Sequence, residues 1–175
     1  GTSLENNRQN KYTQISRDLG EDLRTAFAEF VQQEAGMAWL PGQNGIPMPL
    51  VVVGTPSRNL ANERLSDWVE ALAKKENKRI QDYRYTYSMD QDNKHFIYKM
   101  PVKGIPEALF GSLFSEVIGE YFGFAGNYLI IADNRKAIQD VIYFKTLNKT
   151  LNTDPVYASV IEQISTRNNF IFSLA

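Results

Sequence analysis

The spacing of apolar residues along the chain predicts helices that alternate with pairs of strands. In five segments apolar side chains recur every three or four residues, which places them on one face of a helix. The segments expected as helices are 19–31, 60–75, 109–118, 137–142 and 157–164. Asp18 and the pair Asp133-Asn134 stand where N-terminal caps are expected, and residues 55–59 offer cap oxygens to the second helix.

Three hairpins are expected between these helices. The first joins residues 36–40 to 50–53 through a long tip, and the third joins 121–124 to 128–132 through Gly126-Asn127. Glycine and asparagine tolerate the positive φ of a tight turn. A last strand is expected to begin near Phe170.

The middle hairpin, residues 82–100, is rich in aromatic rings. A four-residue turn at its tip would place Tyr87 opposite Phe96, and also Arg84 opposite Lys99. The rings then form a ladder on one face: Tyr83, Tyr85, Tyr87, Phe96 and Tyr98. Such a ladder is either a stacking platform for sugars or peptides, or the packing face of a half-buried strand, which we favour.

This order of elements predicts an α+β fold: an antiparallel or mixed sheet built from hairpins, with the helices packed on one face. Residues 1–16 are polar and lack an apolar period, so we expect them to be a poorly ordered lead. Residues 17–175 are expected to form a single α+β domain. The leading Gly1 resembles a protease scar, and the last strand lacks a stop signal, so we expect a fragment of a longer chain.

Composition excludes several chemistries. Lys and Arg number 19 and Asp and Glu number 20, giving a net charge of −1, which argues against a nucleic-acid groove or a polybasic membrane patch. The chain has no Cys and a single His, so thiolate catalysis, iron–sulfur ligation and Cys- or His-rich metal sites cannot be assembled within it. No run approaches the ~20 apolar residues of a membrane-spanning helix. We assign no catalytic, cofactor-binding or metal-binding residue, and no cofactor.

Carboxylates are the remaining candidates for catalysis. Glu107, Glu116, Glu120 and Asp133 could supply the acid pair of a glycoside hydrolase, if two of them lay at catalytic separation. For Asp133 we favour a role as a helix cap.

Two polar features of the middle hairpin have simpler interpretations. Asp90, Asp92 and Asn93 are residue types found in calcium loops, but the Gly and the distant Glu of such loops are missing, so a turn is expected. His95 lies between Lys94 and Lys99 without a second ligand, and is expected to be a solvated strand residue.

The second half of the chain carries a pattern of structural positions. A glycine-rich aromatic segment leads into a strand that ends at Asp133-Asn134, and a short helix around Ile138 follows. Then come Thr150-Leu151, the segment 154–157 and a closing aromatic strand at 169–172. In this pattern, over about residues 97–175, the chain resembles a family of large uncharacterised cell-envelope proteins of Bacteroidetes, assigned to a domain of unknown function. The resemblance implies an exported protein with an N-terminal anchor, located in the periplasm or at the cell surface, and implies no catalytic residue.

Two functions therefore stay open. The first is a noncatalytic structural or binding module of an extracytoplasmic envelope protein. Its partners would be other domains of the same parent chain or an extracellular polymer, with no nucleic acid and no membrane contact by the domain itself. The second is a carboxylate-dependent glycan hydrolase.

Overall fold

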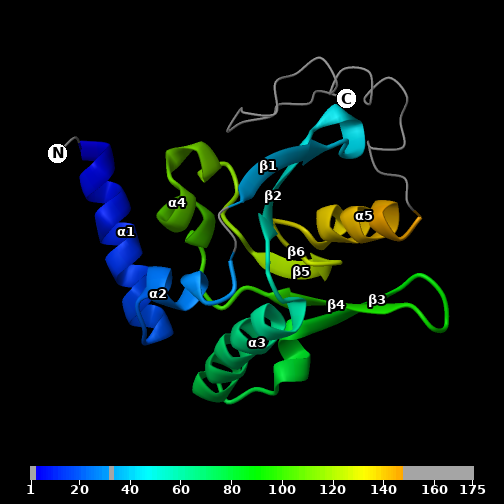
Figure 1. Cartoon of the computed structure of the whole chain (residues 1–175), viewed down its shortest axis with the longest axis horizontal. Helices are drawn as coiled ribbons and strands as arrows, with labels where there is room; N and C mark the ends of the chain where they lie inside the picture. The colour runs from blue at the N-terminus through cyan, green and yellow to red at the C-terminus, as the bar shows by residue number, and fades with distance from the viewer. Residues whose placement is uncertain (1–2, 32–33, 148–175) are drawn as a thin grey trace.

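The computed structural model describes residues 3–31 and 34–147, which form a six-stranded antiparallel sheet with helices (Figure 1). The helices are α1 (Ser3–Leu19), α2 (Leu23–Ala28), α3 (Arg58–Lys75), α4 (Ile105–Phe110) and α5 (Arg135–Thr146). The strands are β1 (Ala35–Leu40), β2 (Met48–Gly54), β3 (Arg84–Ser88), β4 (Lys94–Lys99), β5 (Tyr121–Ala125) and β6 (Tyr128–Ala132). Their order in the sheet is β1-β2-β6-β5-β4-β3. The expected α+β class and the three hairpins, β1–β2, β3–β4 and β5–β6, are confirmed.

The helices cover the two faces of the sheet unequally. Helices α1 to α4 share one core with alternate residues of the strands, and this core includes Phe30, Trp68, Val51 and Ile131. On the other face α5 packs alone, beside β5 and β6 (Figure 1). The expectation placed every helix on one face. The structure differs because the short connection after β6 turns α5 back over the opposite side of its own hairpin.

Gly123 is the point where α5 comes closest to the sheet. A Cβ built on Gly123 would stand 2.8 Å from Cγ2 of Ile138, closer than packed carbon atoms approach. Hydrogen in place of a side chain therefore lets α5 rest directly on β5.

A single helix cannot cover this second face. A helix with its side chains is about 10–12 Å across, whereas six strands spaced ~4.8 Å apart make a sheet about 24 Å wide. Side chains of the outer strands that point to the α5 side therefore pack only partly among the described residues. They are Ala38, Leu40, Met48 and Val52 beside β1–β2, and Tyr85, Tyr87 and Met89 beside β3.

The lead expected to be poorly ordered is the helix α1. Tyr12, Ile15 and Leu19, spaced three and four residues apart, pack on the larger core, and Ile15 is buried. Arg8 also donates to the carbonyl of Leu109, which joins α1 to α4. The prediction was wrong because this apolar stripe is sparse and the exposed face of α1 is wholly polar.

The helix expected at 19–31 starts later, as α2. Gly20 has φ +79°, a left-handed conformation that ends α1, and the chain turns before α2 begins. Asp22, rather than Asp18, is the N-cap of α2, and its carboxylate accepts from the backbone N–H of Thr25 at 2.9 Å.

Two further helix predictions have different outcomes. The helix expected at 109–118 is the shorter α4, followed by a 3-10 turn, Ser112–Phe114, and Leu113 and Ile118 of the predicted stripe are exposed. The helix expected at 157–164 and the strand near Phe170 lie outside the described residues. Within the described part of the chain, no helix has the length and apolar character needed to cross a membrane.

Candidate binding surfaces

The register of the β3–β4 hairpin differs by one residue from the expectation. Tyr87 lies opposite His95 and Arg84 opposite Tyr98, because the loop between the strands holds five residues instead of four. A one-residue slip turns side chains to the other face of a sheet. The expected pairing of Arg84 with Lys99 is therefore absent from this hairpin, and the expected single ladder of rings is divided between two faces.

The rings on the α1–α4 face serve the core. Tyr83 and Tyr98 are buried there, and Tyr98 stacks on Phe122 with ring centroids 5.2 Å apart. Phe96 remains 40% exposed, with the guanidinium carbon of Arg84 4.4 Å from its ring centroid. Core packing, the interpretation favoured from the sequence, is confirmed for Tyr83 and Tyr98, whereas Phe96 lies outside the core.

The rings on the α5 face form a partly exposed surface. Tyr85 of β3 and Tyr121 of β5 meet edge to face with centroids 5.9 Å apart, and the guanidinium carbon of Arg135 lies 4.1 Å from the Tyr85 ring centroid and 6.0 Å from that of Tyr121. We call this set, with Tyr87 and His95, the tyrosine–arginine surface. It combines side chains of the β3–β4 hairpin with one from β5 and one from α5.

Arg135 is the unusual member of this surface. It is exposed at the first residue of α5, where the positive end of the helix dipole disfavours a cation, and the first turn of α5 has no acidic residue. Among the described residues no carboxylate forms an ion pair with it. The guanidinium of Arg135 lies over the Tyr85 ring as a cation–π contact, and the exposed side chain keeps N–H donors available to an anion.

His95 is only partly solvated, which differs from the expectation. Its ring lies 6.5 Å from that of Tyr87, and its Nδ1 is buried without a hydrogen-bond partner in the described part of the chain. Burial lowers the pKa of His95, and the nearby charge of Arg58 lowers it further. Both effects favour the neutral form of the imidazole.

The carboxylates considered for catalysis each hold part of the fold. Two of them form ion pairs, Lys11–Glu107 and Lys103–Glu120. Glu116 accepts from the indole N–H of Trp39 at 3.2 Å. These contacts tie α1 to α4, the loop after β4 to the start of β5, and β1 to the loop before β5.

Asp133 does not cap α5. Its carboxylate accepts from the backbone N–H groups of Gly119 at 2.7 Å and Ile118 at 3.2 Å, and so fastens the loop before β5. The cap is Asn134, which accepts from the N–H of Ala137 at 2.8 Å. The sequence predicted a cap at Asp133-Asn134, with Asp133 favoured, and the structure shows that Asn134 is the cap.

The residues compared with a calcium loop form a turn, as expected. The carboxylate of Asp90 accepts from the backbone N–H groups of Asp92 and Asn93 and from the Asn93 side chain. Within residues 3–31 and 34–147, no group of three or more His, Asp or Glu side chains could hold a metal ion.

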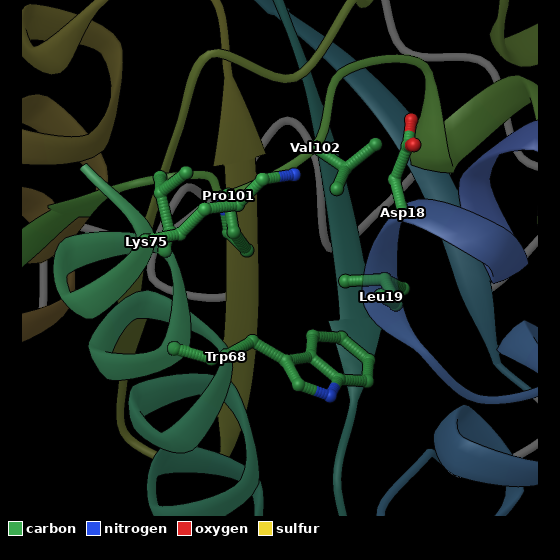
Figure 2. A pocket seen from close by; sticks show the side chains of 8 residues that line it. Asp18, Leu19, Trp68, Lys75, Pro101 and Val102 are labelled. Atoms are coloured by element: carbon green, nitrogen blue, oxygen red, sulfur yellow. The ribbon is translucent and has the colours of Figure 1, made fainter.

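Several cavities among the described residues lie away from the tyrosine–arginine surface. One, of about 500 Å³, lies where the β2–α3 loop meets the β5–β6 turn, and its lining includes Thr55, Tyr128 and Lys145. Another, of about 340 Å³, lies along α1 beside Arg24 and Ala108. A further one, also of about 340 Å³, lies between the end of α1 and α3, and we call it the α1–α3 pocket (Figure 2). It is lined by Asp18, Leu19, Trp68, Ala71, Leu72, Lys75, Pro101 and Val102.

Together these observations define an α+β domain with an aromatic and cationic surface on the half-covered face of its sheet. No protein-family model, no curated protein and no solved structure matches the chain. The resemblance to envelope proteins therefore stays a prediction from the sequence.

Proposed function

We propose that this chain is a noncatalytic binding module of an extracytoplasmic envelope protein, and that its tyrosine–arginine surface holds an acidic extracellular polysaccharide. The observation that carries the proposal is Arg135, an exposed guanidinium that lies against two tyrosine rings and forms no ion pair with a carboxylate of the described residues. The extracytoplasmic location, and contact with other domains of a longer parent chain, rest on the resemblance alone.

The chemistry of the surface favours a uronic acid unit as the ligand. A guanidinium presents two parallel N–H donors to a carboxylate, a geometry that a lysine cannot match. Beside that charge lie the hydroxyl groups of Tyr85 and Tyr121. A tyrosine hydroxyl can both donate a hydrogen bond to a sugar hydroxyl and accept one from it. A partly exposed aromatic surface with a cation at its edge suits a repeating acidic sugar chain, in which many weak contacts add up.

The alternative of a glycan hydrolase lacks such support. Glu107 and Glu120 are engaged with lysines, Glu116 with an indole N–H and Asp133 with two backbone N–H groups. Each contact gives its carboxylate a structural role, so the geometry favours binding without turnover.

A panel of oligosaccharides tests the proposal, with binding and the release of reducing ends measured separately. We expect saturable, salt-sensitive binding of oligomers of a uronic acid, weaker binding of their neutral counterparts, and no release of reducing ends. Arg135→Ala should weaken binding about tenfold, the value of a charge-assisted hydrogen bond of ~1.4 kcal/mol.

Lys136 supplies the matched control. It is the next residue of α5 and is exposed, but it forms an ion pair with Asp140. Because Asp140 already pairs with the charge of Lys136, Lys136→Ala should change the affinity for the oligosaccharide less than about twofold. Release of reducing ends would show that the protein is a hydrolase instead. Equal affinities of the Arg135→Ala variant and the unchanged protein would show that Arg135 does not bind the oligosaccharide.

A further inference from the structure

The α1–α3 pocket is formed because its two helices pack on different partners. Helix α1 is fastened to α4 by the Lys11–Glu107 ion pair and by the contact of Arg8 with the Leu109 carbonyl. Helix α3 packs on the sheet through buried residues such as Leu65 and Val69. The end of α1 and the C-terminal half of α3 thus face each other across a cavity of about 340 Å³. This volume falls within the ~300–1,000 Å³ usual for small-molecule sites.

The wall formed by Trp68 is held in place by a hydrogen bond and by ring contacts. The indole N–H donates to the carboxylate of Glu21 at 2.6 Å, and the ring packs against Phe27 with centroids 5.5 Å apart. In Figure 2 the indole nitrogen is turned away from Val102, so the carbon edge of the ring faces the side where Leu19 and Val102 lie. An apolar group in the pocket would therefore meet preformed carbon surface.

Opposite charges lie on the two walls of the pocket. Asp18 comes from α1 and Lys75 from α3, and in Figure 2 the ammonium of Lys75 reaches toward Val102, with Asp18 on the far side. Asp18 accepts from the side chain of Gln14 at 2.9 Å through one of its two oxygens. No carboxylate of the described residues pairs with Lys75, whereas its neighbour Lys74 pairs with Glu70 at 2.9 Å.

We infer that the α1–α3 pocket binds a free α-amino acid with an apolar side chain. Its ammonium group would pair with Asp18, its carboxylate with Lys75, and its side chain would lie against Trp68 and Leu72. The opposite charges of Asp18 and Lys75 beside apolar side chains complement the two charges and the side chain of an apolar amino acid. A ligand with only one charge would leave either Asp18 or Lys75 without a partner. This site is distinct from the tyrosine–arginine surface, because it belongs to the α1–α4 face of the sheet.

The test is a titration of the 175-residue chain with L-leucine and L-phenylalanine, followed by the NMR signal of the Trp68 indole N–H. The Trp39→Phe variant identifies that signal, because Trp39 and Trp68 are the two tryptophans. N-acetyl-L-leucine, which lacks the ammonium charge, and L-leucinamide, which lacks the carboxylate, are the comparison ligands. We expect saturable shifts with the free amino acids and affinities about fivefold lower for each blocked form, the upper range for an exposed ion pair.

Variants separate the two charges. Asp18→Asn should make free leucine bind as weakly as its N-acetyl form, and Lys75→Gln should make it bind as weakly as leucinamide. Lys74→Gln is the control and should bind like the unchanged protein. Thermal melting of each variant checks that it is folded.

Two results would overturn the inference. If the blocked ligands bind as well as the free amino acid, the pocket takes an apolar side chain of a polypeptide and the charges are incidental. If the Trp68 signal does not move at any concentration up to tens of millimolar, the pocket is not an amino acid site. Neither result bears on the polysaccharide proposal, because Arg135 lies outside this pocket.

Discussion

The substitution Gly123→Ala measures how tightly α5 packs on the second face of the sheet. The added Cβ would stand 2.8 Å from Cγ2 of Ile138 and 3.6 Å from Cγ1 of Ile97. Ile138 is fully buried and β5 is held between β4 and β6, so neither side can yield without strain. We expect the free energy of unfolding to fall by about 1–3 kcal/mol, the usual cost of an extra methyl group in a packed core. For a chain of this length each kcal/mol lowers the melting temperature by about 2–4 °C.

Urea denaturation followed by circular dichroism measures the change. Gly36→Ala is the matched control, because Gly36 is exposed on the edge strand β1 and a Cβ there meets no atom within 4 Å. That control should change the free energy of unfolding by less than about 0.5 kcal/mol.

A double-mutant cycle then separates steric strain from a loss of strand propensity. Ile138→Ala alone should lower the free energy of unfolding by about 2–5 kcal/mol. When Gly123 is already alanine, the same substitution should lower it by at least ~1 kcal/mol less, because removing the Ile138 side chain relieves the clash. Strictly additive costs, or a Gly123→Ala variant as stable as Gly36→Ala, would contradict the packing of α5 described above.

Three further outcomes are expected. Burial, and then the charge of Arg58, lower the pKa of His95, so the unfolded chain binds more protons than the folded chain as the pH falls below about 6.5. The melting temperature of the unchanged protein should therefore fall more between pH 7.5 and 5.5 than that of the His95→Gln variant. Hydrogen bonds from the side chain and then the backbone of Asn93 lower the pKa of Asp90. The ionised carboxylate of Asp90 therefore stabilises the fold above pH ~4, and this contribution is lost as acid protonates the carboxylate. The Asp90→Ala variant should lose less stability than the unchanged protein in acid denaturation. Thr55 is buried and its hydroxyl donates to a carbonyl of the β5–β6 turn at 2.8 Å, so Thr55→Val should lower the free energy of unfolding by about 1 kcal/mol and Thr55→Ser by less, measured in urea.

Elements governed by short-range signals were predicted well. The helix α3 follows an apolar stripe, and its N-cap is Ser57, whose hydroxyl accepts from the N–H of Leu60. The β5–β6 hairpin follows from two apolar runs around Gly126-Asn127, and its two-residue loop matches the expectation. In these segments the local preference and the tertiary packing agree.

Features set by distant contacts were missed. The length of the β3–β4 loop depends on whether Met89 joins the strand or the loop, and one residue decides which face every ring occupies. The covering of the second face by α5 depends on the close approach at Gly123, and a glycine in a strand does not reveal what packs on it. The stripe of α1 was too sparse to be distinguished from a polar lead.

The candidate surface was predicted only in part. Tyr85 and Tyr87 were named as possible stacking rings, but Tyr121 and Arg135 come from β5 and α5 and meet them only in the folded chain. A signal was present in the sequence: once Asp133-Asn134 is taken as a cap, Arg135 falls in the first turn of a helix, where a cation is unfavourable.

The most direct test of the central claim is to map, by NMR chemical shifts, where an oligomer of a uronic acid contacts the ¹⁵N-labelled protein. The account predicts that the largest shifts include the side-chain Nε–H of Arg135 and backbone amides around Tyr85 and Tyr121, and that high salt reduces them. Shifts confined to other parts of the chain, or shifts that persist unchanged in the Arg135→Ala variant, would contradict it.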